Sequence, residues 1–198
     1  MKKAAVLIGL IVFIAGMAVF AHSAEKKSGA PAATDCSKAV IPDTPVAGMM
    51  GKTAWKPVVV ELRKTGSMEA DGMKFDTYDL EFRSEESMFA KRTASVTFLV
   101  KKGKTLDGLT FRYLPNTEIR KQPLAVDGFP EVQAWDFRDR EKDQEITFVS
   151  NKGGSLKLEL GNASGKTLSG KINMCVPATK DSQCVAATVS GAFQATVK

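Results

Sequence analysis

TYDLEFR, residues 77–83, is the stretch of this chain that decides its fold class. Three large apolar side chains, Tyr78, Leu80 and Phe82, alternate there with acidic residues. Because successive side chains of a β-strand point to opposite faces of a sheet, this alternation buries one face and leaves the other in water. The stretch therefore predicts a strand of a sheet that is covered on one side only.

Strand-like patterns continue on both sides of this stretch, and turn-forming Asn, Asp, Gly and Pro residues separate them at short intervals. Short strands with such spacing are typical of sandwiches and barrels. We predict an all-β protein with a single antiparallel β-sandwich, and barrel-like closure is the alternative. Only residues 84–92 are ambiguous, since they fit a short helix capped by Ser84 and equally a wide hairpin loop. The other predicted strands are 57–63, 93–100, 108–114, 132–138, 145–150, 155–160, 168–177 and 184–197.

The first 24 residues, 1–24, have the layout of a secretory signal peptide. Lys2 and Lys3 are followed by an uncharged apolar run, Ala4–Ala21, and then by small residues. The run approaches the length of a membrane span, so a retained anchor is the alternative. We expect cleavage, export to the periplasm or the extracellular space, and no stable membrane span in the mature protein.

Residues 25–46 predict a flexible leader, because they are rich in Ala, Pro, Ser and Lys and poor in large apolar groups. We place the folded domain at residues 47–198. A domain of about 150 residues buries roughly 70% of its unfolded surface, which is enough for a hydrophobic core.

Charge and histidine content exclude several classes of protein. The formal net charge is +6, and it falls to +4 when residues 1–24 are removed with their two lysines. This mild excess favours weak attraction to anionic surfaces and does not indicate a nucleic-acid-binding protein. The only histidine is His22, at the signal boundary, so the predicted domain has none. That excludes Ser-His-Asp and Cys-His catalytic pairs and ordinary histidine zinc sites.

No motif for a catalytic, cofactor-binding or metal site stands out in the remaining sequence. GNASGKT, residues 161–167, lacks the spacing and the following helix of a phosphate-binding loop, and it predicts a hairpin turn. Carboxylates such as Asp79 and Asp136 are plentiful, but most of them alternate with apolar residues or lie in turns. We therefore assign no catalytic residue, no cofactor and no metal ligand.

The cysteines predict a structural bridge. Three cysteines without a histidine are too few for a zinc site. Cys175 and Cys184 lie on consecutive predicted strands, and both fall in phase with polar residues. Because an oxidising compartment favours disulfides, we predict a Cys175–Cys184 bridge on the solvent face of this hairpin, with Cys36 left over in the leader. The same phase directs six apolar residues to the core, namely Ile172, Met174, Val176, Val185, Val189 and Phe193.

Three segments, 96–111, 168–177 and 189–197, resemble a group of exported bacterial proteins of unknown function. The shared features are an apolar strand before a lysine-and-glycine turn, a G-K-I strand that ends in Cys-x-Pro, and a closing strand of small residues. The resemblance implies an exported β-rich domain and transfers no catalytic motif.

The lack of catalytic motifs favours a non-catalytic binding or interaction module of the cell envelope, whose partner or ligand the sequence does not name. The alternative is a carboxylate-dependent hydrolase that acts on envelope polysaccharide. Such an enzyme would need two carboxyl groups about 5–10 Å apart in an open groove.

Overall fold

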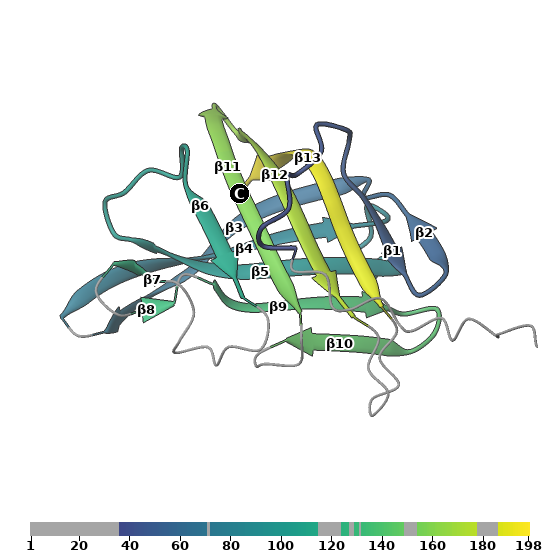
Figure 1. Cartoon of the computed structure of the whole chain (residues 1–198). Helices are drawn as coiled ribbons and strands as arrows, with labels where there is room; N and C mark the ends of the chain where they lie inside the picture. Colours follow the sequence, from purple (N-terminus) through teal and green to yellow (C-terminus); the bar gives the residue numbers. More distant parts are fainter. Residues whose placement is uncertain are drawn as a thin grey trace, which may run out of the picture.

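The computed structural model describes residues 36–70, 72–114, 124–126, 129–130, 132–148, 154–177 and 186–198. The predicted signal peptide lies outside this part of the chain. The described residues form an all-β fold, and none of them is helical (Figure 1). The strands are β1 (Ala47–Met50), β2 (Thr53–Trp55), β3 (Val59–Ala70), β4 (Met73–Arg83), β5 (Arg92–Lys101), β6 (Thr110–Tyr113), β7 (Leu124–Val126), β8 (Phe129–Pro130), β9 (Val132–Asp139), β10 (Gln144–Phe148), β11 (Ser155–Ser164), β12 (Thr167–Val176) and β13 (Ala187–Val197).

One continuous sheet builds most of the molecule, with the strand order β10-β9-β5-β4-β3-β13-β12-β11-β6. We call β10, β9, β5, β4 and β3 the β4 layer, and β13, β12, β11 and β6 the β12 layer. The strands of the two layers cross at a steep angle in Figure 1, and their inner faces enclose the core. The sheet is not closed into a barrel, so the sandwich prediction describes it better than the barrel alternative.

The two layers join at β13. One edge of this strand pairs with β1 near one end and with β3 near the other end. β12 pairs with the whole length of β13, whereas the opposite edge is shared by β1 and β3. The β3 pairing is parallel, at Thr196 with Glu61 and Val197 with Leu62. The prediction of a purely antiparallel sheet is therefore wrong at this junction. The β1–β2 hairpin explains the difference, because it reverses the chain and β3 leaves it in the direction of β13.

Aromatic side chains from both layers meet in the core. Phe82 of the β4 layer contacts Phe193 of the β12 layer edge to face, with ring centroids 5.4 Å apart. Phe98 and Phe111 meet across the layers at 4.5 Å. Tyr113 and Trp135 are each only 1% exposed, so both pack in the core.

The β12–β13 hairpin has the side-chain phase that the sequence predicts. Ile172, Met174, Val189 and Phe193 are buried, whereas Gln194 is exposed. Val176 is also buried, and Val185 lies outside the described residues. The Phe193 ring occupies the space where its cross-strand partner Gly170 lacks a side chain.

The β4–β5 loop and the β11–β12 turn test the predictions for residues 84–92 and for GNASGKT. Residues 84–91 form a loop, so the hairpin alternative is the right one for the ambiguous segment. GNASGKT continues β11 into β12 through a turn at Gly165, whose φ is +60°. The segment is thus a hairpin, as predicted, and no helix follows it to hold phosphate.

Truncation of Phe193 tests this register. Phe193→Ala should lower the free energy of unfolding by about 3–5 kcal/mol, because it empties a contact between the layers. Gln194→Ala is the matched control on the opposite face and should cost less than about 0.5 kcal/mol. Urea unfolding of both variants provides the measurement. A costly Gln194→Ala with a silent Phe193→Ala would show that β13 is shifted by one residue.

Candidate binding surface

The disulfide that the structure forms is Cys36–Cys175, with a Cα–Cα distance of 6.1 Å. The predicted bridge between Cys175 and Cys184 is therefore wrong in its partner. The β12–β13 register gives the reason, because it places Thr188 opposite Cys175. Cys184 lies outside the described residues. Cys175 does point to the outer face of β12, as predicted, but residues from the N-terminal side cover it.

The covering segment, residues 36–46, is called the strap here. Its first residue is fixed by hydrogen bonds as well as by the disulfide. The Cys36 amide donates to Ser155 Oγ at 2.6 Å, and Asn173 Nδ2 donates to the Cys36 carbonyl at 3.3 Å. Ile41, further along, is only 5% exposed. The strap thus belongs to the folded domain, and the leader predicted for residues 25–46 is too long at its C-terminal end.

The end of the strap continues along β13. The Val46 amide donates to the Ala192 carbonyl, and the Ala192 amide donates to the Thr44 carbonyl, both at 2.8 Å. Gly191 is required for this close approach. Its φ is +130°, and a β-carbon there would lie 2.6 Å from the Thr44 carbonyl oxygen. The strap is therefore held at one end on the outer face of β12 and at the other end along the edge of β13.

Two cations oppose each other on this outer face, beside the strap. Arg112 of β6 and Lys157 of β11 are cross-strand partners, and each lies between buried residues of its own strand. Their side chains therefore share the outer face. Like charges directly opposite each other destabilise a sheet, so the pair costs stability and needs another reason to be present.

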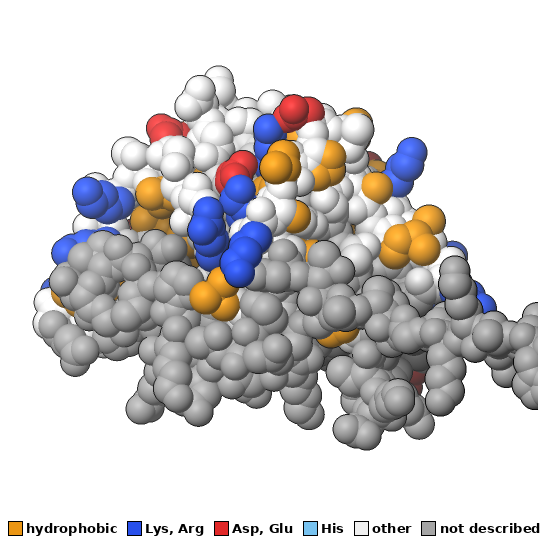
Figure 2. Space-filling view, viewed as in Figure 1, with side chains coloured by type: hydrophobic (Ala, Val, Ile, Leu, Met, Phe, Trp, Pro, Cys, Tyr) orange, Lys and Arg blue, Asp and Glu red, His pale blue; other side chains and the backbone are white. Residues whose placement is uncertain are grey.

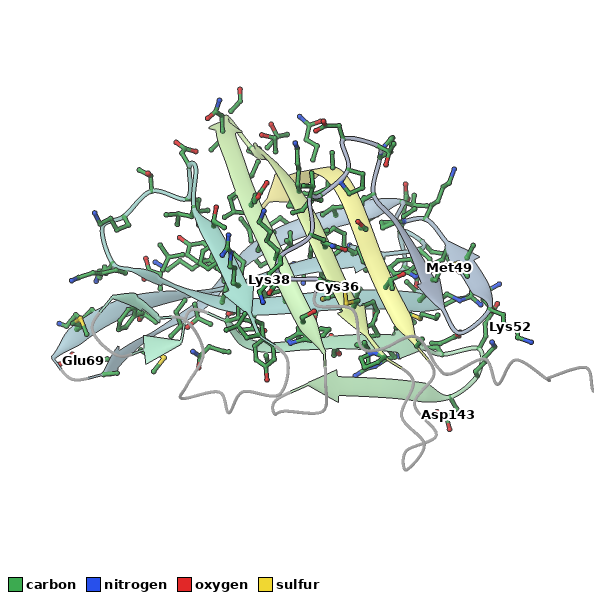
Figure 3. All side chains as sticks on the ribbon, viewed as in Figure 1. Cys36, Lys38, Met49, Lys52, Glu69 and Asp143 are labelled. Atoms are coloured by element: carbon green, nitrogen blue, oxygen red, sulfur yellow. A yellow bond between two sulfur atoms is a disulfide. The ribbon has the colours of Figure 1, made fainter. Side chains whose placement is uncertain are left out.

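The strap adds a third cation to this pair. Lys38 is exposed and lies two residues after Cys36, and Figure 3 shows it in front of β11. Figure 2 shows Lys and Arg side chains gathered in the middle of the same face. We call Lys38, Arg112 and Lys157 the basic cluster.

The acidic residues near the basic cluster are engaged in ion pairs. Glu159 pairs with Lys157 at 2.6 Å. Asp43 of the strap pairs with Lys171, and this hydrogen bond raises the pKa of the lysine above its ordinary value. Arg112 has no ion pair with any residue that the structure describes. Among the described residues of this face, Arg112 therefore carries a positive charge that no ion pair offsets.

A shallow groove of about 330 Å³ runs over β11, β12 and β13 next to these charges. Glu159, Ser169 and Lys171 give it polar walls, and Gly161 and Gly170 are also among its lining residues. A flat polar face with a shallow groove and excess cations can bind an extended anionic chain by charge and hydrogen bonding.

The carboxylates of the hydrolase alternative lie on the other layer. Asp79 of β4 and Asp136 of β9 are separated by β5, on the outer face of the β4 layer. Burial raises the pKa of Asp79 above its usual range. A hydrogen bond from Thr97 Oγ1 at 3.3 Å lowers this pKa in part, whereas the negative charges of Glu81 and Asp136 raise it further. Asp136 accepts a hydrogen bond from Ser95 Oγ.

The groove over β11, β12 and β13 includes neither Asp79 nor Asp136. Across the described ranges, no group of three or more His, Cys, Asp or Glu residues could hold a metal ion. No helix in the described part of the chain is long and apolar enough to cross a membrane.

Comparison of the chain with known protein families, with curated proteins and with solved structures found no match. The disulfide is consistent with an exported protein, because such bonds persist in oxidising compartments.

Sequence reasoning missed the basic cluster for a structural reason. Strand phase alone turns Arg112 and Lys157 outward, since each is flanked by apolar residues. Their opposition depends on the pairing of β6 with β11, and more than 40 residues separate the two along the chain. No local sequence pattern indicates that β6 and β11 pair.

Replacement of Cys36 tests the bridge. Cys36→Ser should lower the free energy of unfolding by about 3–5 kcal/mol, since the bond closes a loop of 139 residues. Cys184→Ser is the control and should leave both the bridge and the stability unchanged. Peptide mapping under non-reducing conditions, combined with denaturant unfolding, provides the measurement. A Cys175–Cys184 peptide in the unmodified protein would contradict the structure.

Asp79 gives a prediction for pH dependence. Its pKa is raised in the folded state, so its protonated form contributes stability at low pH that is lost as pH rises through this pKa. Asp79→Asn imitates the protonated form and should raise the urea midpoint at pH 7 but not at about pH 3. The exposed Glu69→Gln should change the midpoint at neither pH. A lower midpoint for Asp79→Asn at pH 7 would show that the Asp79 charge is stabilising instead.

Proposed function

We propose that this chain is an exported, non-catalytic binding module that holds an anionic polymer of the cell envelope on its basic cluster. The observation that carries the proposal is the like-charge pair Arg112–Lys157, which lies in register on an outer face. Retaining this pair costs stability, and an anionic ligand would turn the repulsion into attraction.

Two further features support the same surface. The disulfide-anchored strap brings Lys38 to the face from a part of the chain far from β6 and β11. The adjacent groove over β11, β12 and β13 offers polar walls along which an extended chain can lie. The site makes contacts through charge and hydrogen bonds and needs no reacting group.

Binding to dextran sulfate, with neutral dextran as the reference, tests the proposal. The double variant Arg112→Ser/Lys157→Ser should weaken binding to dextran sulfate roughly tenfold, or about 1.4 kcal/mol. Affinity of the unmodified protein should fall as salt is raised, because the attraction is screened. Biolayer interferometry at several salt concentrations provides the measurement.

Lys64→Ser is the control, because it removes a cation from the β4 layer. It should change the affinity less than twofold. Equal binding of dextran and dextran sulfate, or equal losses in the control and the double variant, would contradict the proposal.

A polysaccharide hydrolase remains the second candidate, and the raised pKa of Asp79 beside Asp136 favours it. A raised pKa is the direction of shift that a carboxyl general acid requires. Turnover of envelope polysaccharide that is lost in both Asp79→Asn and Asp136→Asn, with their folds intact, would establish this candidate over the binding module.

A further inference from the structure

An exposed apolar knob stands on the loop between β4 and β5. Its two residues, Met88 and Phe89, are 73% and 75% exposed. Large adjacent apolar side chains are costly to leave in water, and such exposed patches usually mark an interaction surface. Aromatic residues and Met are also enriched in the centres of protein interfaces.

The loop that carries the knob has a defined conformation. Ser84 and Arg92 close its base with two hydrogen bonds of 2.9 and 3.0 Å. Arg83, which is buried, donates from Nη1 to the Glu86 carbonyl at 3.2 Å. Ala90 is fully buried directly after the knob. These contacts fix the loop in a conformation that leaves both side chains exposed, which lowers the ordering cost of binding.

An apolar groove of about 560 Å³ lies on the outer face of β1, β2 and β13. Ala47, Met49, Ala54 and Trp55 supply most of its walls, and Lys56 supplies a cation. Grooves of this volume hold drug-sized ligands, so it has room for the side chains of the knob.

The knob and this groove are at the same end of the molecule. The β9–β10 turn, residues 140–143, contacts the knob and also the β1–β2 hairpin that forms part of the groove. Arg140 lies over the Phe89 ring at 5.6 Å from its centroid, and Lys142 Nζ donates to Thr53 Oγ1 beside β2 at 3.3 Å. Figure 3 shows Met49 and Lys52 of the β1–β2 hairpin at the same end as Asp143 of this turn.

Charge complements shape between these two features. Glu85 and Glu86 precede the knob on its loop, and Glu86 is exposed. Lys56 lines the groove, and Lys52 is exposed on the adjacent turn. A knob from one molecule would therefore bring acidic side chains to the basic rim of a groove in another.

We propose that two copies of this chain form a dimer in which each inserts Met88 and Phe89 into the β1–β2–β13 groove of the other. A two-fold dimer needs a self-complementary surface, where residue i meets residue j and j meets i. Knob and groove at one end of the same molecule meet that requirement. Glu85 and Glu86 beside the knob complement Lys52 and Lys56 beside the groove, which favours a second copy of the chain as the occupant.

Sedimentation velocity of the exported chain, over a range of concentrations, tests the dimer. The unmodified protein should shift from monomer to dimer as its concentration rises. Phe89→Ser, which empties the knob, and Ala54→Arg, which fills the groove, should each raise the dimer dissociation constant at least about tenfold. Val40→Ser is the matched control, since it removes an apolar side chain that is 91% exposed on the strap. It should leave the constant unchanged.

A mixture of the two variants provides a sharper test. Phe89→Ser retains an open groove and Ala54→Arg retains a knob, so one of the two contacts is restored in a mixed dimer. The mixture should associate more strongly than either variant alone. A protein that stays monomeric at all concentrations, or a dimer that neither variant weakens, would overturn the proposal. Binding to lipid vesicles that depends on Phe89 would assign the knob to a membrane and would also overturn it.

Discussion

The short parallel pairing of β13 with β3 is the constraint on which the rest of the structure depends. It joins two sets of antiparallel strands into one sheet that folds back on itself, and the inner faces then bury the aromatic contacts between the layers. Phe193 reaches Phe82 because β13 is fixed at this corner. Between its contacts with β1 and β3, this edge of β13 also pairs with the strap at Ala192.

The strap connects this architecture to the candidate binding surface. The Cys36–Cys175 bond fixes one end of the strap on β12, and main-chain hydrogen bonds to Ala192 fix the other. Lys38 is thereby placed on the face where Arg112 and Lys157 already repel each other. Three segments that are distant in sequence thus contribute positive charge to one surface. The fold tolerates the repulsion because the hydrophobic core lies between the layers, away from this outer face.

Much of the fold could be predicted from local sequence, and the candidate site could not. Alternation in stretches such as TYDLEFR specifies both the existence of a strand and its buried face, because the side-chain period of two is a local property. The Cys36–Cys175 bond, the strap and the Arg112–Lys157 pair depend on contacts between distant segments. The prediction of a flexible leader was wrong for residues 36–46. The polar composition of this segment implies a high entropic cost of ordering, but the burial of Ile41 and the disulfide offset that cost. The Met88–Phe89 knob lies in the segment whose pattern was ambiguous.

The central claim is that the disulfide holds Lys38 where it can act with Arg112 and Lys157 on an anionic ligand. A double-mutant cycle between Cys36→Ser and Lys38→Ser, read as affinity for dextran sulfate, tests it most directly. Lys38→Ser should weaken binding roughly fivefold in the disulfide-bonded protein, as expected for one cation near an anionic surface. It should have almost no effect in the Cys36→Ser background. Equal losses in both backgrounds, or no loss in the bonded protein, would contradict the account.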